Sequence, residues 1–490
     1  MVRGRLALVI LACGCGRFHF DPLDGPADAR GDAAIAPDAL GPVDIAYVKA
    51  SDTTAFAELG ISVAISGDAQ TFATGAIDVN GAASHTGAAY VYVRSGATWA
   101  QQAKLTAQGA QALDELGNAI AVSGDGSTLV VGASQEDGGT TGVNSVDDNA
   151  AIDAGAAYVF ERTGTTWAET AYVKASNTNA GDQFGTSVAI SGDGSTIAIG
   201  AISEASASTG IDGDQGDNSQ PAAGAVYVFV RNGATWVQQA YLKASNTDSN
   251  DAFGFAVALS NDGNTLAVGA EGEASATIGI GGSQADNSAP QAGAIYVFAR
   301  ADTAWSQQAY VKGSETTSGN FLGESVALSP DGNTLAGGAP GDDSAAPNAG
   351  AVFVFARTGT TWSEQATVVA SNEDADDQFG ASVALGDGLL MSGSPQEDGG
   401  GSGFTGDAAD NSSVDSGAAY VFERTGGTWA QAAYVKATNP GAGDDYGTSV
   451  TLADLGFAAG ANREDSSTTG IDSTPDDNAT DSGAAYVMFR

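Results

Sequence analysis

The sequence predicts an all-β fold, a seven-bladed β-propeller with four-stranded antiparallel blades whose ring is closed by the N-terminal strand. One motif recurs seven times, each copy contains four short strand-like segments, and the last copy lacks the fourth. Four strands per unit, repeated several times, are typical of propellers. The motif glycines lie at intervals of 57, 68, 69, 69, 57 and 67 residues and are Gly60, Gly117, Gly185, Gly254, Gly323, Gly380 and Gly447.

The elements of one copy are clearest between residues 184 and 245. FGTSVAISGDGSTIAIGA (184–201) predicts two strands joined by an Asp-Gly turn, because glycine accepts the positive φ of a tight hairpin. GAVYVFVRNGATW (224–236) supplies the third strand and the tryptophan that opens the fourth, which QQAYLKAS (238–245) completes. The six tryptophans share this repeat position, which predicts packing between blades: Trp99, Trp167, Trp236, Trp305, Trp362 and Trp429.

The two ends of the repeat region complement each other. The last copy ends with GAAYVMFR (483–490) and has no fourth strand, whereas IAYVKAS (45–51) matches the fourth strand of the other copies. Pairing of these ends would close the ring and remove exposed sheet edges. We therefore expect one domain over residues 45–490.

Residues 1–15 resemble a bacterial lipoprotein signal. Arg3 and Arg5 precede an apolar run that ends at Cys13 and is too short to span a bilayer. The resemblance implies acylation of Cys13, with Cys15 as the second choice, and an ordinary secretory signal is the alternative. The protein is thus expected to be secreted and lipid-anchored, in the outer membrane or at the cell surface.

The composition separates a tether from an acidic body. Residues 16–44 are rich in Pro, Gly, Ala and Asp and are predicted to be a disordered tether. The formal net charge of −41 would repel nucleic acid and anionic membranes, so membrane contact is expected only through the lipid anchor. Seven arginines are assigned to one strand position and the lysines to another, which leaves no basic patch for nucleic acid; the lysines are Lys49, Lys104, Lys174, Lys243, Lys312 and Lys436.

Two short motifs frame the first two strands of each copy. Phe184-Gly185 is followed by Gly200-Ala201, and another copy has the literal Gly338-Ala339-Pro340. This pattern resembles the FG-GAP repeat of integrin α-subunits and of many secreted bacterial proteins, over about residues 46–490. The resemblance implies a seven-bladed propeller used for cell-surface binding and adhesion. In that family several first hairpins carry a calcium loop of pattern D-x-D-x-D-G-x-x-D, but hairpins here, such as SGDGST, keep one carboxylate.

A set of acidic residues recurs in copies 2, 3, 4, 6 and 7, which also carry a long loop between the second and third strands. These five loops hold 23 of the 59 acidic residues. An Asp lies three residues before the first-motif glycine: Asp114, Asp182, Asp251, Asp377 and Asp444. A Glu lies four residues after the second-motif glycine: Glu136, Glu204, Glu273, Glu397 and Glu464. An Asp-Asn pair lies in mid-loop: Asp148-Asn149, Asp217-Asn218, Asp286-Asn287, Asp410-Asn411 and Asp477-Asn478.

The long loop and the carboxylates occur together. Copies 1 and 5 lack the loop and have Ala57 and Asn320 in place of the Asp. The Asp and the Glu are expected at the same end of adjacent strands, where like charges repel. Several carboxylates with an amide suit Ca²⁺ in a flexible loop, so we hypothesise five calcium sites. The equal alternative is that Asp and Asn cap turns by accepting backbone N–H groups.

These features favour a non-catalytic binding or adhesion module that presents acidic loops on one propeller face to an extracellular protein or glycan. No catalytic residue is predicted, because His19 and His85 are isolated and the carboxylate pairs repeat in five blades. The alternatives are an extracellular propeller enzyme acting on polysaccharide or another polymer, and a passive envelope protein. We expect a monomer with no cofactor other than calcium.

Overall fold

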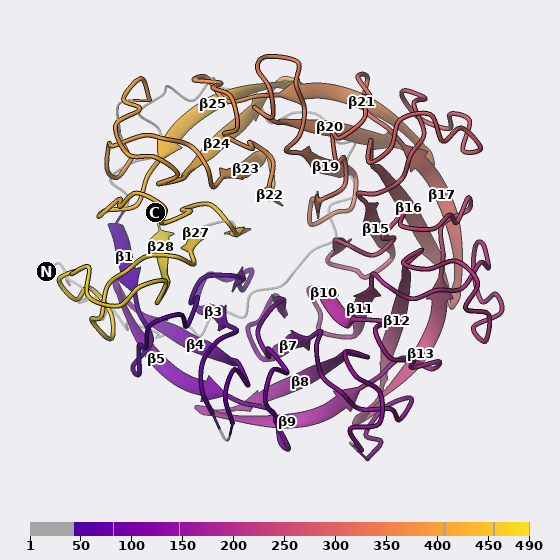
Figure 1. The fold of residues 1–490 in the computed structure, drawn as a ribbon, viewed down its shortest axis with the longest axis horizontal. Coiled ribbons are helices and arrows are strands. Elements are labelled where there is room, and N and C mark those ends of the chain that lie inside the picture. The colour runs from indigo at the N-terminus through magenta and orange to yellow at the C-terminus, as the bar shows by residue number, and fades with distance from the viewer. Residues whose placement is uncertain (1–43, 82, 147, 405–407, 454–455, 490) are drawn as a thin grey trace, which may run out of the picture. The chain divides into compact units, whose positions relative to one another are not determined.

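Seven separate four-stranded antiparallel sheets form a ring in the computed structural model (Figure 1). The structure describes residues 44–489 except 82, 147, 405–407 and 454–455. The predicted signal with Cys13 and Cys15, and the tether up to residue 43, lie outside the described residues. The described part of the chain has no helix, and therefore none that is long and apolar enough to cross a membrane. The prediction of a seven-bladed, all-β propeller is confirmed.

Within each blade the strands follow one another from the centre of the ring outwards (Figure 1). Blades 1 and 2 contain β2 (Val63–Ile65), β3 (Thr71–Ala76), β4 (Ala88–Ser95), β5 (Thr98–Leu105), β6 (Ile120–Val122), β7 (Thr128–Ala133), β8 (Ala156–Thr163) and β9 (Thr166–Val173). Blades 3 and 4 contain β10 (Phe184–Ile190), β11 (Thr196–Ala201), β12 (Ala225–Asn232), β13 (Thr235–Leu242), β14 (Val257–Leu259), β15 (Thr265–Ala270), β16 (Ala294–Ala301) and β17 (Ala304–Val311).

The remaining three blades follow the same order. Blades 5 and 6 contain β18 (Ser325–Leu328), β19 (Thr334–Ala339), β20 (Ala351–Thr358), β21 (Thr361–Val368), β22 (Ser382–Leu385), β23 (Leu389–Ser394), β24 (Ala418–Thr425) and β25 (Thr428–Val435). Blade 7 contains β26 (Val450–Ala453), β27 (Gly456–Ala461), β28 (Ala484–Phe489) and, as its outer strand, β1 (Asp44–Val48).

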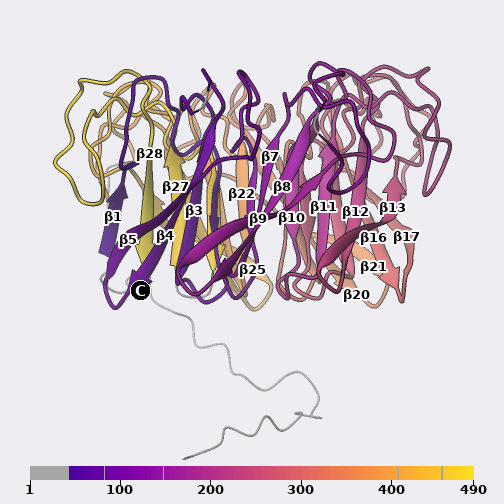
Figure 2. The same cartoon turned by 90° about the horizontal axis from the view of Figure 1, so that it is seen from below.

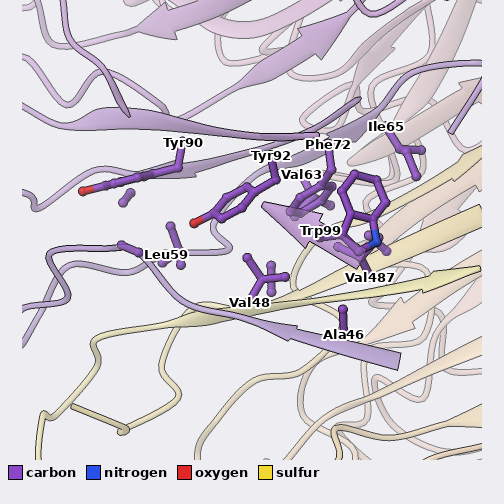
Figure 3. Packing of buried hydrophobic residues seen from close by; sticks show 14 of the residues in the cluster. Ala46, Val48, Leu59, Val63, Ile65, Phe72, Tyr90, Tyr92, Trp99 and Val487 are labelled. Atoms are coloured by element: carbon purple, nitrogen blue, oxygen red, sulfur yellow. The ribbon is translucent and has the colours of Figure 1, made fainter. Parts of the chain in front are cut away.

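The start of the described chain closes the ring, as predicted. β1 pairs antiparallel with β28 over its whole length. In Figure 3, Ala46 and Val48 of β1 lie in one buried apolar cluster with Tyr92 and Trp99 of blade 1. The closing strand therefore completes one blade and also packs against the next.

The tryptophans pack between blades, which confirms their structural role. Four indole N–H groups donate to a glutamine of the preceding blade at 2.7–3.0 Å: Trp167 to Gln102, Trp305 to Gln239, Trp362 to Gln308 and Trp429 to Gln365. Each glutamine lies at a bulge, where the pairing of the third and fourth strands shifts by one residue. β1 has no bulge, and the indole N–H of Trp99 has no hydrogen-bond partner among the described residues.

Two glycines of each copy bring adjacent blades into contact. The first-motif glycine has a φ between 94° and 108° in all seven copies, which disfavours any other residue. The carbonyl oxygen of Gly254 lies against Cα of Gly200 in the preceding blade, so a side chain at Gly200 would overlap that oxygen. Ser187 Oγ of the preceding blade donates to the same oxygen at 2.7 Å. The repeated glycines thus reflect a backbone contact between blades.

The two ends of the propeller differ in the length of their loops. Figure 2 shows short hairpin turns at one end and the long connections at the other. We call the second end the long-loop face; its long loops are residues 134–155, 202–224, 271–293, 395–417 and 462–483. In blades 1 and 5 the equivalent loops are short, at residues 77–87 and 340–350.

Replacing Gly200 by alanine tests the contact between blades. We expect Gly200→Ala to destabilise the protein by about 1–3 kcal/mol, because the added methyl group forces blades 3 and 4 apart. Gly216→Ala is the control, since this glycine has no positive φ and a side-chain carbon there would meet Asp214 at an ordinary 3.4 Å. Denaturant unfolding measures both variants, and equal free energies of unfolding would contradict the contact.

Candidate functional site

Each long loop folds back over the outer strand of its own blade. In blade 3, Gly210 is in the left-handed region and its carbonyl accepts the N–H of Lys243 at 2.8 Å. Ile211 then forms a bridge to Leu242, and the N–H of Asp212 donates to the carbonyl of Tyr241 at 2.8 Å. We call these short stretches covering segments; they begin at Gly142, Gly210, Gly279, Gly403 and Gly470. They pair backbone groups that the outer strand would otherwise leave exposed.

A buried ion pair lies at the base of each long loop. In blade 3 the Nζ of Lys243 is 2.8 Å from Oε2 of Glu204, and neither residue is accessible to solvent. The other four pairs, at 2.7–2.9 Å, are Glu136 with Lys174, Glu273 with Lys312, Glu397 with Lys436 and Glu464 with Lys49. Burial lowers the pKa of the Lys243 ammonium, and the charge of Glu204 opposes this decrease. The lysine therefore supplies the positive charge that the clustered carboxylates need.

Neutral donors complete the surroundings of each glutamate. In blade 4 the hydroxyl of Tyr310 donates to Oε1 of Glu273 at 2.9 Å. The side chain of Asn246, from the connection that precedes blade 4, donates to the same oxygen at 3.1 Å. Lys312 also donates to the carbonyl of Gly293 at the end of the long loop. A buried charge is tolerated when its hydrogen bonds are satisfied in this way, and the asparagine extends the network across two blades.

The lysine and the tyrosine belong to this site, although sequence reasoning did not place them there. The sequence signal that could have placed them is that the glutamate and the lysine are both replaced wherever the long loop is missing. Blade 1 has Val79 and Thr106 at these two positions, and blade 5 has Asp342 and Val369. The assignment of Lys104 to the lysine position is wrong. Lys104 pairs with the third strand at the place where Tyr172 and Tyr241 stand in other blades, so it occupies the tyrosine position.

The predicted aspartates before the first-motif glycine are buried and cap a turn. Each accepts the backbone N–H three residues earlier: Asp114 from Gln111, Asp182 from Asn179, Asp251 from Asp248, Asp377 from Asp374 and Asp444 from Gly441. Burial, which outweighs this hydrogen bond, raises the pKa of Asp182 to about 7, and the nearby charge of Glu204 adds to the increase. The pKa is likewise raised to about 7 for Asp251, Asp377 and Asp444.

The Asp-Asn pairs lie farther out in the loops. Asp217 accepts the backbone N–H groups of Ala207 and Ser219, at 3.0 and 3.1 Å, and Asp286 caps its own loop in the same way. In blade 7 this capping is done by Asp476 instead of Asp477, and hydrogen bonds lower the pKa of Asp476 to about 2. The remaining predicted members are in the same part of their loops: Asp148, Asn149, Asn218, Asn287, Asp410, Asn411 and Asn478.

The donor set differs from what a calcium site requires. In blade 4 the oxygens of Glu273 are bonded to lysine, tyrosine and asparagine donors, which Ca²⁺ would have to displace. Within the described ranges, no group of three or more His, Cys, Asp or Glu side chains is placed to hold a metal ion. The contacts thus fit the capping alternative better, with lysine as the cation. Calcium binding stays a prediction for direct titration.

The seven closed blades and their repeated loop anchors define a repeat β-propeller. The family of the FG-GAP repeat matches five segments that together cover more than half of the chain: 99–160, 167–229, 236–298, 305–355 and 362–422. The chain belongs to the FG-GAP repeat family. Each matched segment begins at the tryptophan of one outer strand and ends in the third strand of the next blade, so one sequence repeat spans two blades.

Solved structures support the fold and nothing finer. The crystal structure of RRP9 WD40 repeats is similar with a TM-score of 0.51 and 9% sequence identity, over 91% of this chain and 98% of that one. At this identity the likeness concerns the fold alone. Comparison with curated proteins gives no match.

Removing one partner of a buried ion pair tests the anchor of the loop. Lys243→Met leaves the Glu204 carboxylate without a counter-charge and should lower the free energy of unfolding by about 3–5 kcal/mol. The double variant Lys243→Met, Glu204→Gln should recover much of this loss, because no unpaired charge remains. Lys104→Met removes a solvent-accessible ion pair with Asp52 and should cost at most about 1 kcal/mol. Equal losses in the Lys243 and Lys104 variants, measured by denaturant unfolding, would refute the proposed anchor.

The raised pKa of the buried aspartates predicts a pH dependence. The ordinary pKa of 3.8 is raised to about 7 for Asp182 in the folded protein, so the folded state binds the proton more tightly. The contribution of Asp182 to the free energy of unfolding should therefore rise as the pH falls from 8 to 5. Asp182→Asn copies the natural Asn320 of blade 5 and should raise the melting temperature more at pH 8 than at pH 5. A difference that is the same at every pH would contradict the shifted pKa.

Proposed function

We propose that this chain is a non-catalytic binding module whose long-loop face contacts an extracellular protein or glycan. The supporting observation is that every long loop is fixed twice, by its covering segment and by the buried ion pair at its base. A loop that is already ordered loses less conformational entropy when it binds a partner. Blades 1 and 5 lack both the loop and the ion pair, so the anchor serves the loop.

Charge and exposed apolar side chains indicate the chemistry of the ligand. A protein of net charge −41 attracts cationic groups over long distances, which favours a ligand with positive charge. The long loops also expose large apolar side chains: Val146 (78%), Ile152 (69%), Ile278 (61%) and Val414 (59%). Exposed apolar groups among acidic ones are suited to a protein partner or to the apolar face of a sugar.

We also propose that the protein lies outside the cell with a lipid anchor at Cys13, and the register of the closing strand shows where the chain enters the propeller. Asp44, the first described residue, pairs with Phe489, which also pairs with Gly456 beside the turn between β26 and β27. The chain therefore enters the propeller at the end opposite the long-loop face. An anchor that precedes Asp44 would therefore be joined to the propeller at the end opposite the long loops.

Converting blade 4 to the form of blade 5 tests the binding face. The variant replaces residues 271–293 by the sequence 340–350 and adds Asp251→Asn, Tyr310→Thr and Lys312→Val, all residues that blade 5 carries naturally. It should keep its melting temperature within a few degrees and lose at least tenfold in affinity for ligands found with the parent on an array of purified cell-surface proteins and glycans. Asp262→Asn, in a hairpin at the opposite end, should bind like the parent.

The same array separates the alternatives. Undiminished binding by the blade 4 variant would refute the long-loop face as the binding surface. Running the array in calcium and in chelator tests the calcium hypothesis, together with a calorimetric calcium titration. No heat of binding and a melting temperature that is indifferent to chelator would eliminate calcium.

A further inference from the structure

The seven outer strands differ in how their exposed edges are protected. In five blades the covering segment accepts the N–H of the lysine, and in blades 2, 3 and 7 it also pairs with the N–H and the carbonyl of the tyrosine, as for Tyr241 in blade 3. The bulge near the middle of each full-length outer strand separates this stretch from the rest of the edge. Unprotected sheet edges pair readily with other chains, so natural proteins cover or charge them.

Blades 1 and 5 lack a covering segment, and the exposed edges of their outer strands differ from each other. In blade 1 a charged side chain, Lys104, stands on the edge and pairs with Asp52 at 2.6 Å. In blade 5 the equivalent residues of β21 and its extension are Thr367 and Val369, which are uncharged. Val369 is 37% exposed, whereas the lysines at this position in the covered blades are at most 1% exposed. The edge of blade 5 therefore has neither cover nor positive charge.

A groove accompanies this edge. It has a volume of about 510 Å³ and is lined by residues 365–371 of blade 5 and by Phe422, Trp429 and Gln431 of blade 6. Trp429 is partly exposed here, whereas the other five tryptophans are buried. An exposed edge beside a groove is the arrangement by which domains bind an extended peptide as an added strand.

We propose that the edge of β21 from Ala366 to Ala370 binds an extended segment of a partner polypeptide as a fifth strand of blade 5. The covering segments of blades 2, 3 and 7 are the template, because there Gly-Ile or Gly-Val followed by Asp or Asn pairs with the matching groups of the outer strand. A branched apolar side chain of the segment enters the groove at Trp429. Glu364, which accepts the Thr367 hydroxyl at 3.3 Å, favours a basic residue in the segment.

The net charge of the chain decides between a partner and a second copy. Two copies would each bring a charge of −41 to the contact, and β21 offers no basic side chain to offset it. Charge complementarity instead favours a neutral or basic segment from another protein. This inference does not depend on the function proposed for the long-loop face.

A synthetic peptide tests the proposal with the intact protein. The probe is acetyl-Lys-Thr-Gly-Ile-Asn-Lys-amide, which follows the covering segments but carries a positive charge. We expect saturable binding with a dissociation constant below about 1 mM, a free energy of about −4 kcal/mol, and slower amide hydrogen exchange at residues 366–370. Val369→Pro removes one N–H donor from the edge and should weaken binding at least tenfold. Thr106→Pro, at the same position in blade 1, is the matched control and should bind like the parent.

A second variant keeps the test informative if the proline disturbs blade 5. Val369→Lys places on the edge the residue that the covered blades have, and should repel the basic peptide without a loss in melting temperature. No binding of the peptide at several millimolar, or protection that maps away from β21, would overturn the proposal. A dimer of the parent that becomes a monomer in Val369→Lys, measured by sedimentation, would overturn it in favour of a second copy.

Discussion

The backbone contact between glycines of adjacent blades sets the geometry on which the rest of this propeller depends. The carbonyl of each first-motif glycine lies against the second-motif glycine of the preceding blade, too close for a side chain. That spacing brings the tryptophan of one blade within reach of the glutamine of another and holds the inner strands around the ring. Because every blade is held on both sides, a single chain of repeats becomes one closed unit.

Five blades carry a buried ion pair, which is unfavourable to remove from water but fixes the base of the long loop. Taking Lys243 and Glu204 out of water is unfavourable, and their attraction offsets this only because further donors and acceptors complete the site. The ion pair ties the second strand to the fourth at the point where the long loop leaves and returns. The loop then covers the outer strand and gains a fixed path, so the same contacts stabilise the blade and order the surface.

The departures from the repeat make the surfaces of the blades differ. Blades 1 and 5 lack the long loop, the glutamate and the lysine together, but the exposed edges of their outer strands carry different residues. Lys104 places a charged side chain on the edge in blade 1. In blade 5 the uncharged Val369 leaves the edge exposed beside a partly exposed Trp429. A ring of near-identical units thus acquires distinct surfaces through a few substitutions.

The sequence by itself determined the blade number, the strand order and the closure, because spacing, hairpin turns and complementary ends are properties of neighbours along the chain. It also determined that the buried Asp and Glu recur together with a long loop. Only the tertiary structure decided what these carboxylates contact. Lys243 lies 39 residues from Glu204, and Asn246 reaches Glu273 from the connection before blade 4, so both contacts depend on how strands pair and blades pack. Repulsion among acids therefore pointed to calcium when the sequence was read alone, whereas the fold places a lysine ammonium beside them.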